Sequence, residues 1–287
     1  MNYKITAPKP DPDWSRIFPR GDHRWNMGLR RGNAANFFNN RDVADSVRAE
    51  RARWLADDPE KYAALLPEAE PALHETVQLA RTLGAVIDHD ASPHEQLLSL
   101  GRFWEPDFAW MHPDDHGAHR LIGGVVCFPS SWALREKLGK PMLEIHMPVP
   151  GLNEMLARKI ESLFSKQIPG VVWVRENTNY SRDSHLNHHP SQAIRKLDAT
   201  ITPTEFWIRL EHQLLLKLPS CGSILFGIRV DPYPLARLLE NSQAAAQLEE
   251  VLSTMSPAAA EYKNLTEARP KVIDWLQQAA RNQTRTL

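Results

Sequence analysis

The chain lacks several features that define large classes of protein. Among its 287 residues it has only two cysteines, Cys127 and Cys221, which argues against a disulfide framework and predicts a cytoplasmic protein. No apolar run approaches the roughly 20 residues of a membrane helix, and the first ten residues have no apolar stretch typical of a signal peptide. The 34 Lys and Arg residues are balanced by 35 Asp and Glu residues, so the charge does not indicate a nucleic-acid partner. We therefore expect neither membrane nor nucleic acid among its partners.

The motifs of several common enzyme classes are absent as well. The sequence has no Gly-x-Gly-x-x-Gly motif after a strand, no phosphate-binding Gly-Lys-Ser/Thr loop, no Cys-x-x-Cys pair and no Gly-x-Ser-x-Gly turn. Nucleotide binding, iron–sulfur chemistry and standard hydrolase chemistry therefore lose their main support. Instead, the sequence has nine Trp, 22 Pro and 12 His residues. This composition indicates a loop-rich fold with aromatic-lined cavities, and histidines suited to metal or haem chemistry.

The strongest local pattern lies between residues 206 and 230. Apolar side chains alternate with polar ones from Phe206 to Leu218, which is typical of a half-buried strand and not of a helix. A Pro-Ser-Cys-Gly turn follows at 219–222, and residues 224–230 are rich in β-branched and aromatic side chains. The pattern predicts a long antiparallel hairpin.

The other segments predict helices on both sides of such a sheet. Residues 1–40 are rich in Pro, Asn and Arg, and they predict an extended arm anchored by aromatic side chains at Trp14, Phe18, Trp25, Phe37 and Phe38. We expect helices within 41–83, 132–138, 155–164 and 234–287, strands at 108–111, 121–128, 143–146 and 171–174, and a polar loop at 176–183. This order predicts an α+β fold, with one domain over 41–287 and a sheet core at about 105–232.

Two histidines are candidates for cofactor chemistry. His146 precedes the rigid segment Met-Pro-Val-Pro-Gly, and an imidazole on such a fixed backbone suits an axial ligand or a positioned acid or base. The alternative is a core histidine bonded to a carbonyl. His212 lies between Leu210 and Leu214 on an apolar strand face, where it needs a partner. It is either a satisfied core histidine or a residue that faces a cofactor.

Two groups of histidines have the ligand types of a metal site. His185, His188 and His189 follow a polar stretch, and they can bind a non-haem metal or belong to a surface loop. The second group lies in a turn-rich segment with two aspartates, and a solvated hairpin turn is its simpler interpretation. That group comprises His112, Asp114, Asp115, His116 and His119.

Arginines on the predicted hairpin are candidates for binding carboxylates. Arg209 follows the polar face of the first strand together with Glu211 and Gln213. A guanidinium there can clamp a ligand carboxylate or a haem propionate through two parallel hydrogen bonds. The alternative is a solvated face with cross-strand pairs that include Arg229.

Four stretches, read together, resemble one family. They are Arg24-Trp-Asn-Met-Gly-Leu29, Gly124-Val-Val-Cys-Phe-Pro-Ser-Ser-Trp132 with Glu136-Lys-Leu-Gly-Lys-Pro141, Ile145-His-Met-Pro-Val-Pro-Gly151, and Arg209-Leu-Glu-His-Gln213 leading to Ile224–Arg229. In this order they resemble the DUF3445 family, which is similar to the haem-binding subunit of haem-dependent oxidative N-demethylases. The likeness extends over about residues 20–240.

The resemblance implies a PAS-like antiparallel sheet with helical additions that holds haem b. It also implies oxidative demethylation of a small alkylamine: O₂ is activated at the haem iron, a C–H bond next to nitrogen is hydroxylated, and the product collapses to formaldehyde and the amine. Electrons would come from a partner reductase with FMN and an iron–sulfur cluster. On motif position, the resemblance points to His146 as axial ligand or pocket residue, and to Arg209 and Arg229 as propionate or structural partners. The residue pattern adds His188 as a weaker metal ligand and His212 as a candidate to face the cofactor.

The chain departs from the family pattern at three places. The family's strand usually carries Arg where this chain has His212, and the family's Trp-Arg-x-Asn-Trp-Ser pattern becomes Trp173-Val-Arg-Glu-Asn-Thr-Asn-Tyr-Ser181. The family's acidic stretch after Met-Gly-Leu is replaced by the Asn-rich sequence from Asn33 to Asn40. These changes leave open a second function, that of a PAS-like haem-binding or small-ligand-binding module, a sensor, or a scaffold subunit without the chemistry.

Overall fold

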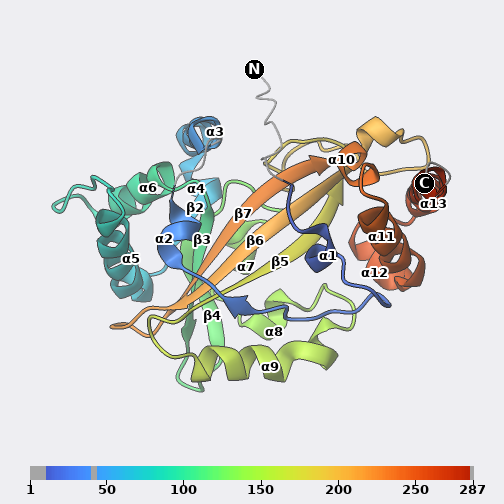
Figure 1. Ribbon diagram of the computed structural model, residues 1–287. Coiled ribbons are helices and arrows are strands. Elements are labelled where there is room, and N and C mark those ends of the chain that lie inside the picture. Colours follow the sequence, from blue (N-terminus) through green and yellow to red (C-terminus); the bar gives the residue numbers. More distant parts are fainter. Residues whose placement is uncertain (1–10, 40–43, 285–287) are drawn as a thin grey trace.

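The computed structural model describes residues 11–39 and 44–284, and these form an antiparallel sheet with helices at both ends (Figure 1). The seven strands lie in the order β1-β5-β6-β7-β3-β4-β2. Their bounds are β1 Arg30–Arg31, β2 Ala63–Leu65, β3 Asp107–Pro113, β4 His119–Val125, β5 Val172–Ser181, β6 Trp207–Lys217 and β7 Ile224–Pro234. The predicted α+β class, with an antiparallel sheet between helical additions, is confirmed. The likeness to PAS proteins stays a prediction.

Helices precede, interrupt and follow the sheet. The N-terminal half has α1 Trp14–Ile17, α2 Ala34–Phe38, α3 Ala44–Asp57, α4 Pro59–Tyr62, α5 Glu70–Thr82 and α6 Pro93–Phe103. The middle has α7 Leu134–Lys137, α8 Met142–Ile145 and α9 Leu152–Lys166, and the C-terminal part has α10 Leu235–Leu239, α11 Ser242–Thr254, α12 Pro257–Tyr262 and α13 Arg269–Thr284. Two short 3₁₀ turns occupy Pro67–Ala69 and Pro203–Glu205.

The predicted hairpin is the centre of the sheet. Strands β6 and β7 pair along their whole length, with His212 opposite Arg229 and Leu216 opposite Leu225. Successive side chains of a strand point to opposite faces, so the alternation in the sequence separates an apolar face from a polar one. The hairpin prediction is confirmed.

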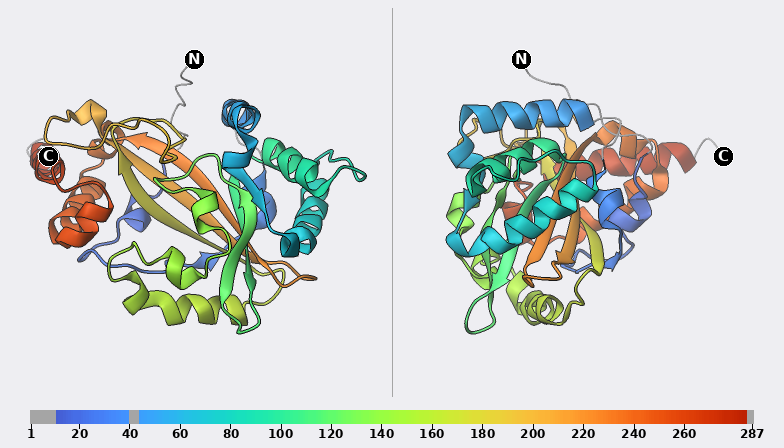
Figure 2. Two further views of the ribbon diagram at one scale, coloured as in Figure 1. Left: turned by 180° about the vertical axis from the view of Figure 1, so that it is seen from behind. Right: turned by 90° about the vertical axis from the view of Figure 1, so that its left-hand side faces the viewer.

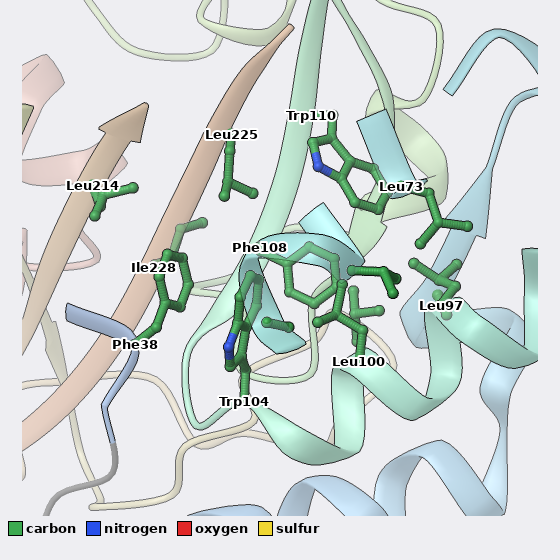
Figure 3. Close-up of a cluster of buried hydrophobic side chains, with 14 of the residues drawn as sticks. Phe38, Leu73, Leu97, Leu100, Trp104, Phe108, Trp110, Leu214, Leu225 and Ile228 are labelled. Atoms are coloured by element: carbon green, nitrogen blue, oxygen red, sulfur yellow. The ribbon is translucent and has the colours of Figure 1, made fainter. Parts of the chain in front are cut away.

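One face of the sheet packs against the N-terminal helices. In this core the Trp104 ring stacks on Phe38 at 4.0 Å between centroids and meets Phe108 edge-on at 5.4 Å (Figure 3). The indole N–H of Trp110 donates to Thr76 Oγ1 at 2.9 Å. Aromatic pairs of this kind add stability beyond the apolar area that they bury.

A second core joins the sheet to the C-terminal helices. Ile208, Leu210 and Tyr233 contribute from the sheet, and the main helical contribution comes from α11 and α13. Trp14 and Phe18 from the N-terminal arm also lie in this core, whereas the arm's other aromatic pair, on α2, lies in the first one. The aromatic side chains of the arm thus lie in both cores. The described part of the predicted arm, residues 11–39, contains the short helices α1 and α2 and is not extended throughout. Residues 1–10 and 40 of the predicted arm lie outside the described residues.

The opposite face of the sheet is covered only in part. Helix α9 and the short α8 cross its lower half (Figure 2), where Phe164 packs against Met111, Leu215 and Ile224. Further along the same face, β5 and β6 present polar side chains instead. That polar stretch is where the candidate functional site lies.

Four segments differ from the sequence-based expectation. Residues 63–65, expected to be helical, form strand β2. Residues 143–146, expected to be extended, belong to α8 and its C-cap. Residues 176–181, expected to be loop, belong to β5, which is ten residues long, because β6 supplies partners for its backbone. Helix α6 was not predicted, although Ser92 and Glu95 form a capping box at its start, a signal that is legible in the sequence.

Candidate functional site

A buried carboxylate, Glu211, lies at the centre of the polar stretch. Its side chain is in the middle of β6, and the residue is only 7% exposed. Oε1 accepts hydrogen bonds from Ser130 Oγ at 2.7 Å and Asn179 Nδ2 at 3.1 Å. Oε2 accepts from Gln213 Nε2 at 3.0 Å and Asn177 Nδ2 at 3.2 Å. All four donors are uncharged, so they fix the carboxylate without neutralising it.

No cationic group forms an ion pair with Glu211 within the part of the chain that the structure describes. Arg175, Arg209 and Lys263 act on Glu211 electrostatically, without forming an ion pair with it. Burying a charge without a counter-ion is costly, and such groups concentrate at functional sites. Glu211 is therefore the first candidate for a group that binds a cationic ligand.

A second carboxylate, that of Asp107, holds the loop that supplies Ser130. Asp107 accepts the backbone N–H groups of Cys127 and Phe128 at 2.8 and 2.9 Å. It also pairs with Arg51, Nη1 to Oδ1 at 2.6 Å, and both side chains are essentially inaccessible. Ser131 follows with a positive φ of 65°, a conformation that costs energy outside glycine and often occurs near functional sites.

His146 lies beside Arg175 at the C-cap of α8. Burial, together with the positive charges of Arg175 and Lys137, lowers the pKa of His146 to about 4. The imidazole is therefore neutral at physiological pH, which is the form that coordinates a metal. Among the described residues, its ring nitrogens have no hydrogen-bond partner.

Arg175 connects His146 to the Glu211 region. It lies on β5 opposite Gln213, and burial lowers its pKa while Glu211 and Glu176 counteract this. Its Nη2 donates to the backbone oxygen of Asn26 at 3.3 Å, but its buried Nε has no hydrogen-bond partner. An orphaned buried N–H of a guanidinium is suited to a carboxylate from outside the chain.

The other face of the same strands holds a network of charged residues around His212. His212 Nε2 lies 3.2 Å from Asp231 Oδ2, and its Nδ1 lies 3.7 Å from Glu176 Oε1. Arg30 Nη1 and Nη2 bind the two oxygens of Glu176 at 2.6 and 2.5 Å. Burial lowers the pKa of His212, but its hydrogen bonds to the two carboxylates outweigh this, so the net shift is upward. The polar residue on an apolar face thus has the protein partners that it requires.

This network predicts acid sensitivity. Burial raises the pKa of Glu176, but hydrogen bonds from His212 and Arg30 lower it to about 2 overall. A depressed carboxylate pKa stabilises the fold above the unfolded value of about 4.3, and that stability is lost as the pH falls toward 2. The lowered pKa of Glu176 contributes up to about 3 kcal/mol to the free energy of unfolding at neutral pH. We expect the free energy of unfolding, measured in urea at pH 6 and pH 3, to differ less in Glu176→Gln than in the wild type. An equal pH dependence in both proteins would contradict this.

The arginines predicted to face a cofactor are held by backbone groups. Arg209 is buried, and its Nη1 and Nη2 donate to the carbonyls of His185 and Leu186 at 2.5 and 2.9 Å. Arg229 donates to the carbonyl of Phe37 and lies 3.6 Å from Glu105. In this structure, Arg209 anchors the loop after β5, and Arg229 ties α2 to the sheet.

The histidines of the two predicted clusters contact protein partners. His185 Nδ1 and His188 Nε2 both lie near Asp183 Oδ1, at 3.4 and 3.1 Å, while His189 bonds Ser191 at 2.9 Å. In the first hairpin, His112 bonds Ser223 and His119 bonds Glu161, at 2.9 and 3.2 Å. Within residues 11–39 and 44–284, no three His, Cys, Asp or Glu side chains group so that they could hold a metal ion.

The comparison with known proteins agrees with the resemblance found in the motifs. Residues 80–273, well over half of the chain, match the family described as haem-dependent oxidative N-demethylase, alpha subunit-like. The chain belongs to this family. Glu211, Arg175, His146 and Asp107 all lie inside the matched residues, whereas the N-terminal arm lies outside them. No described helix of this alpha-subunit-like protein is both long and apolar enough to cross a membrane.

The residues of the candidate site fit the chemistry of haem. His146 offers a neutral imidazole, the common ligand of haem iron. Arg175 offers a buried N–H without a partner for a propionate. Met142, Ile145 and Trp173, which precede His146 and Arg175 in the chain by one to four residues, are partly buried apolar side chains of the kind that suits a porphyrin face. A haem-binding role for these residues is thus chemically consistent with the family.

Sequence reasoning missed the central part of the site. Glu211 was interpreted only as part of a polar strand face, and Asn177 and Asn179 were assigned to a loop. The signal was present in the alternation of Arg175, Asn177 and Asn179, which places these side chains on one face of a strand. Their shared acceptor could be found only after β5 was paired with β6.

Proposed function

We propose that the protein is the haem-binding subunit of an oxidative N-demethylase and that Glu211 binds the cationic nitrogen of a small alkylamine. The observation that carries the proposal is a buried carboxylate with four neutral donors and no ion-pair partner among the described residues. An alkylammonium supplies the missing counter-charge and N–H donors. Family membership supports the haem and N-demethylase parts of the proposal.

In this proposal, His146 coordinates the haem iron and Arg175 binds a propionate. Haem b, when bound, would supply the site at which O₂ is activated for hydroxylation of a C–H bond next to the amine nitrogen. The chain's own contribution is to keep His146 neutral through burial and to keep Glu211 oriented through its four hydrogen bonds. The amine is thereby fixed by its nitrogen, and the methyl group is left to react.

The amine reaches Glu211 by exchanging one of the neutral donors. The longest of the four hydrogen bonds comes from Asn177, at 3.2 Å, and a charge-assisted N–H is roughly twice as strong as a neutral one. Replacing this amide by an ammonium is therefore favourable while Ser130 Oγ, at 2.7 Å from Oε1, keeps the carboxylate in place. The site thus prefers a cation to a neutral molecule of the same shape.

The electrons for this reaction would come from another polypeptide. The sequence lacks Cys-x-x-Cys and dinucleotide-binding motifs, and the family is named for an alpha subunit. We propose a partner reductase with FMN and an iron–sulfur cluster. The roles of Arg209, Arg229 and His212 toward the cofactor, and of His188 as a weaker metal ligand, stay predictions. The protein contacts of all four residues give them structural tasks in any case.

The proposal is tested by haem retention. Purified with haem supplied, the wild-type protein should show a Soret band, and His146→Ala should weaken haem binding at least about tenfold because the iron loses its protein ligand. His89→Ala is the matched control, since its ring is 76% exposed and lies on a loop. Spectral titration of the three proteins with haem measures the difference.

Three outcomes would contradict the proposal or a part of it. A wild-type protein without a Soret band removes the haem function. Haem binding without amine-dependent turnover, in the presence of a competent reductase, favours the alternative of a haem-binding or sensor module without catalysis. Unchanged haem affinity in His146→Ala shows that His146 is not the haem ligand. The proposed contact between Arg175 and a propionate is then tested separately.

A further inference from the structure

The N-terminal arm contacts the segment that carries His146. The indole N–H of Trp25 donates to the backbone oxygen of Pro150 at 2.7 Å. Between His146 and Pro150 the chain makes a turn in which Val149 N–H donates to the His146 carbonyl at 2.9 Å. A hydrogen bond to Pro150 therefore restrains the end of the turn that begins at His146.

The same part of the arm also contacts Arg175. The backbone oxygen of Asn26, the residue after Trp25, accepts from Arg175 Nη2 at 3.3 Å. Arg175 in turn acts electrostatically on His146. Of two consecutive arm residues, Asn26 thus binds Arg175 directly, and Trp25 binds Pro150, at the end of the turn that begins at His146.

Trp25 is itself fixed from the C-terminal side. The ammonium group of Lys263 lies 5.3 Å from the centre of the Trp25 ring and donates to the Thr178 carbonyl at 2.6 Å. Burial lowers the pKa of Lys263 to about 8, yet the group remains largely charged at neutral pH and can hold the ring through a cation–π interaction. Tyr262 adds an edge-on contact at 6.3 Å.

We infer that Trp25 is a positioning residue for His146, through its hydrogen bond to Pro150. The inference rests on the proposed function, because it concerns the histidine assigned there as the haem ligand. Trp25 lies outside residues 80–273, which match the family, so the matched segment receives this support from the arm. The arm is then part of the site and not only a link between the two cores.

Trp25→Phe tests this inference because it removes the indole N–H and keeps an aromatic ring beside Lys263. The matched control is Thr254→Val, which removes the Oγ1 that accepts the His23 N–H at 2.8 Å. The control loosens the same arm without touching Pro150. In the haem-free proteins, we expect amide hydrogen exchange in residues 146–152 to be about 3–10-fold faster in Trp25→Phe only, as expected for the loss of one hydrogen bond.

Spectra of the haem-loaded proteins distinguish a positioning role of Trp25 from a role in stability alone, because loss of stability alone would leave the spectra unchanged. We expect Trp25→Phe to change the ferric absorption and electron paramagnetic resonance spectra, which report the orientation of the axial ligand, and to weaken haem binding about 3–10-fold. Thr254→Val should match the wild type in both. A wild-type protein without a Soret band overturns the proposed function and this inference together. Wild-type spectra and affinity in Trp25→Phe overturn this inference alone, even if local exchange is faster.

Discussion

Glu211→Gln should weaken the binding of a small alkylammonium ion by about 10–100-fold, because a hydrogen bond to a charged group is worth roughly 1.5–3 kcal/mol. The substitution keeps the size of the side chain, removes its charge and replaces one acceptor oxygen by an NH2 donor. In the wild type, the carboxylate is 7% exposed and accepts from four uncharged donors. A cation that enters this environment is attracted by a charge that little water screens.

Calorimetric titration of the haem-loaded protein with mono-, di- and trimethylammonium chloride would measure this effect. Glu60→Gln is the matched control, since it removes the same charge from a side chain that is 69% exposed and paired with Arg135. We expect the control to bind all three ions as the wild type does. Equal affinity in Glu211→Gln and the wild type would show that the carboxylate does not bind the amine. That result would not affect the separate proposal that His146 binds haem.

The contrast between the two faces of β6 explains why Glu211 is the candidate and His212 is not. His212 is surrounded by two carboxylates, and Arg30 pairs with one of them at 2.5 Å. These charges compensate one another within the protein. On the opposite face, Glu211 accepts hydrogen bonds only from uncharged donors, and Arg175, Arg209 and Lys263 act on it without forming an ion pair. In the proposed function, the ligand's ammonium group forms the direct ion pair on this face.

The sequence was sufficient for the parts of the fold that depend on local pattern. The β6–β7 hairpin follows from alternation between Trp207 and Lys217, and the starts of α4 and α12 follow from an N-cap side chain before proline. Strand β5 was underestimated because both of its faces carry polar side chains. Pairing with β6 over ten residues provides the stability that its own composition does not indicate.

The site was predicted only where a contiguous motif marks it. His146 could be singled out because prolines follow it directly, whereas its neutrality depends on burial and on Arg175, which is 29 positions away in the sequence. Arg209 and Arg229 were noticed as cations on a strand, but their acceptors are carbonyls at His185 and Phe37. Contacts over such sequence separations are set by the tertiary fold, and one sequence does not display them.

The largest effect on stability is expected at the base of the site. Asp107→Ala should lower the free energy of unfolding by about 3–5 kcal/mol, because it leaves the buried Arg51 guanidinium without its ion pair. It also removes the acceptor for the backbone N–H groups of Cys127 and Phe128, and unsatisfied buried donors are costly in their own right. Such a loss is a large fraction of the roughly 5–15 kcal/mol that stabilises a typical domain.

Urea unfolding of three further variants separates the two contributions. Asp45→Ala, at a side chain that is 91% exposed and paired only with Arg48, should unfold like the wild type, as is usual for surface pairs. Arg51→Met combined with Asp107→Leu should recover part of the loss, since no charge is then buried alone. Recovery stays incomplete because the two N–H groups still have no acceptor. A loss below about 1 kcal/mol in Asp107→Ala would contradict the buried ion pair.

Because Asp107 holds the loop that brings Ser130 to Glu211, Asp107→Asn, which keeps an acceptor for that loop, should retain more alkylammonium binding than Asp107→Ala.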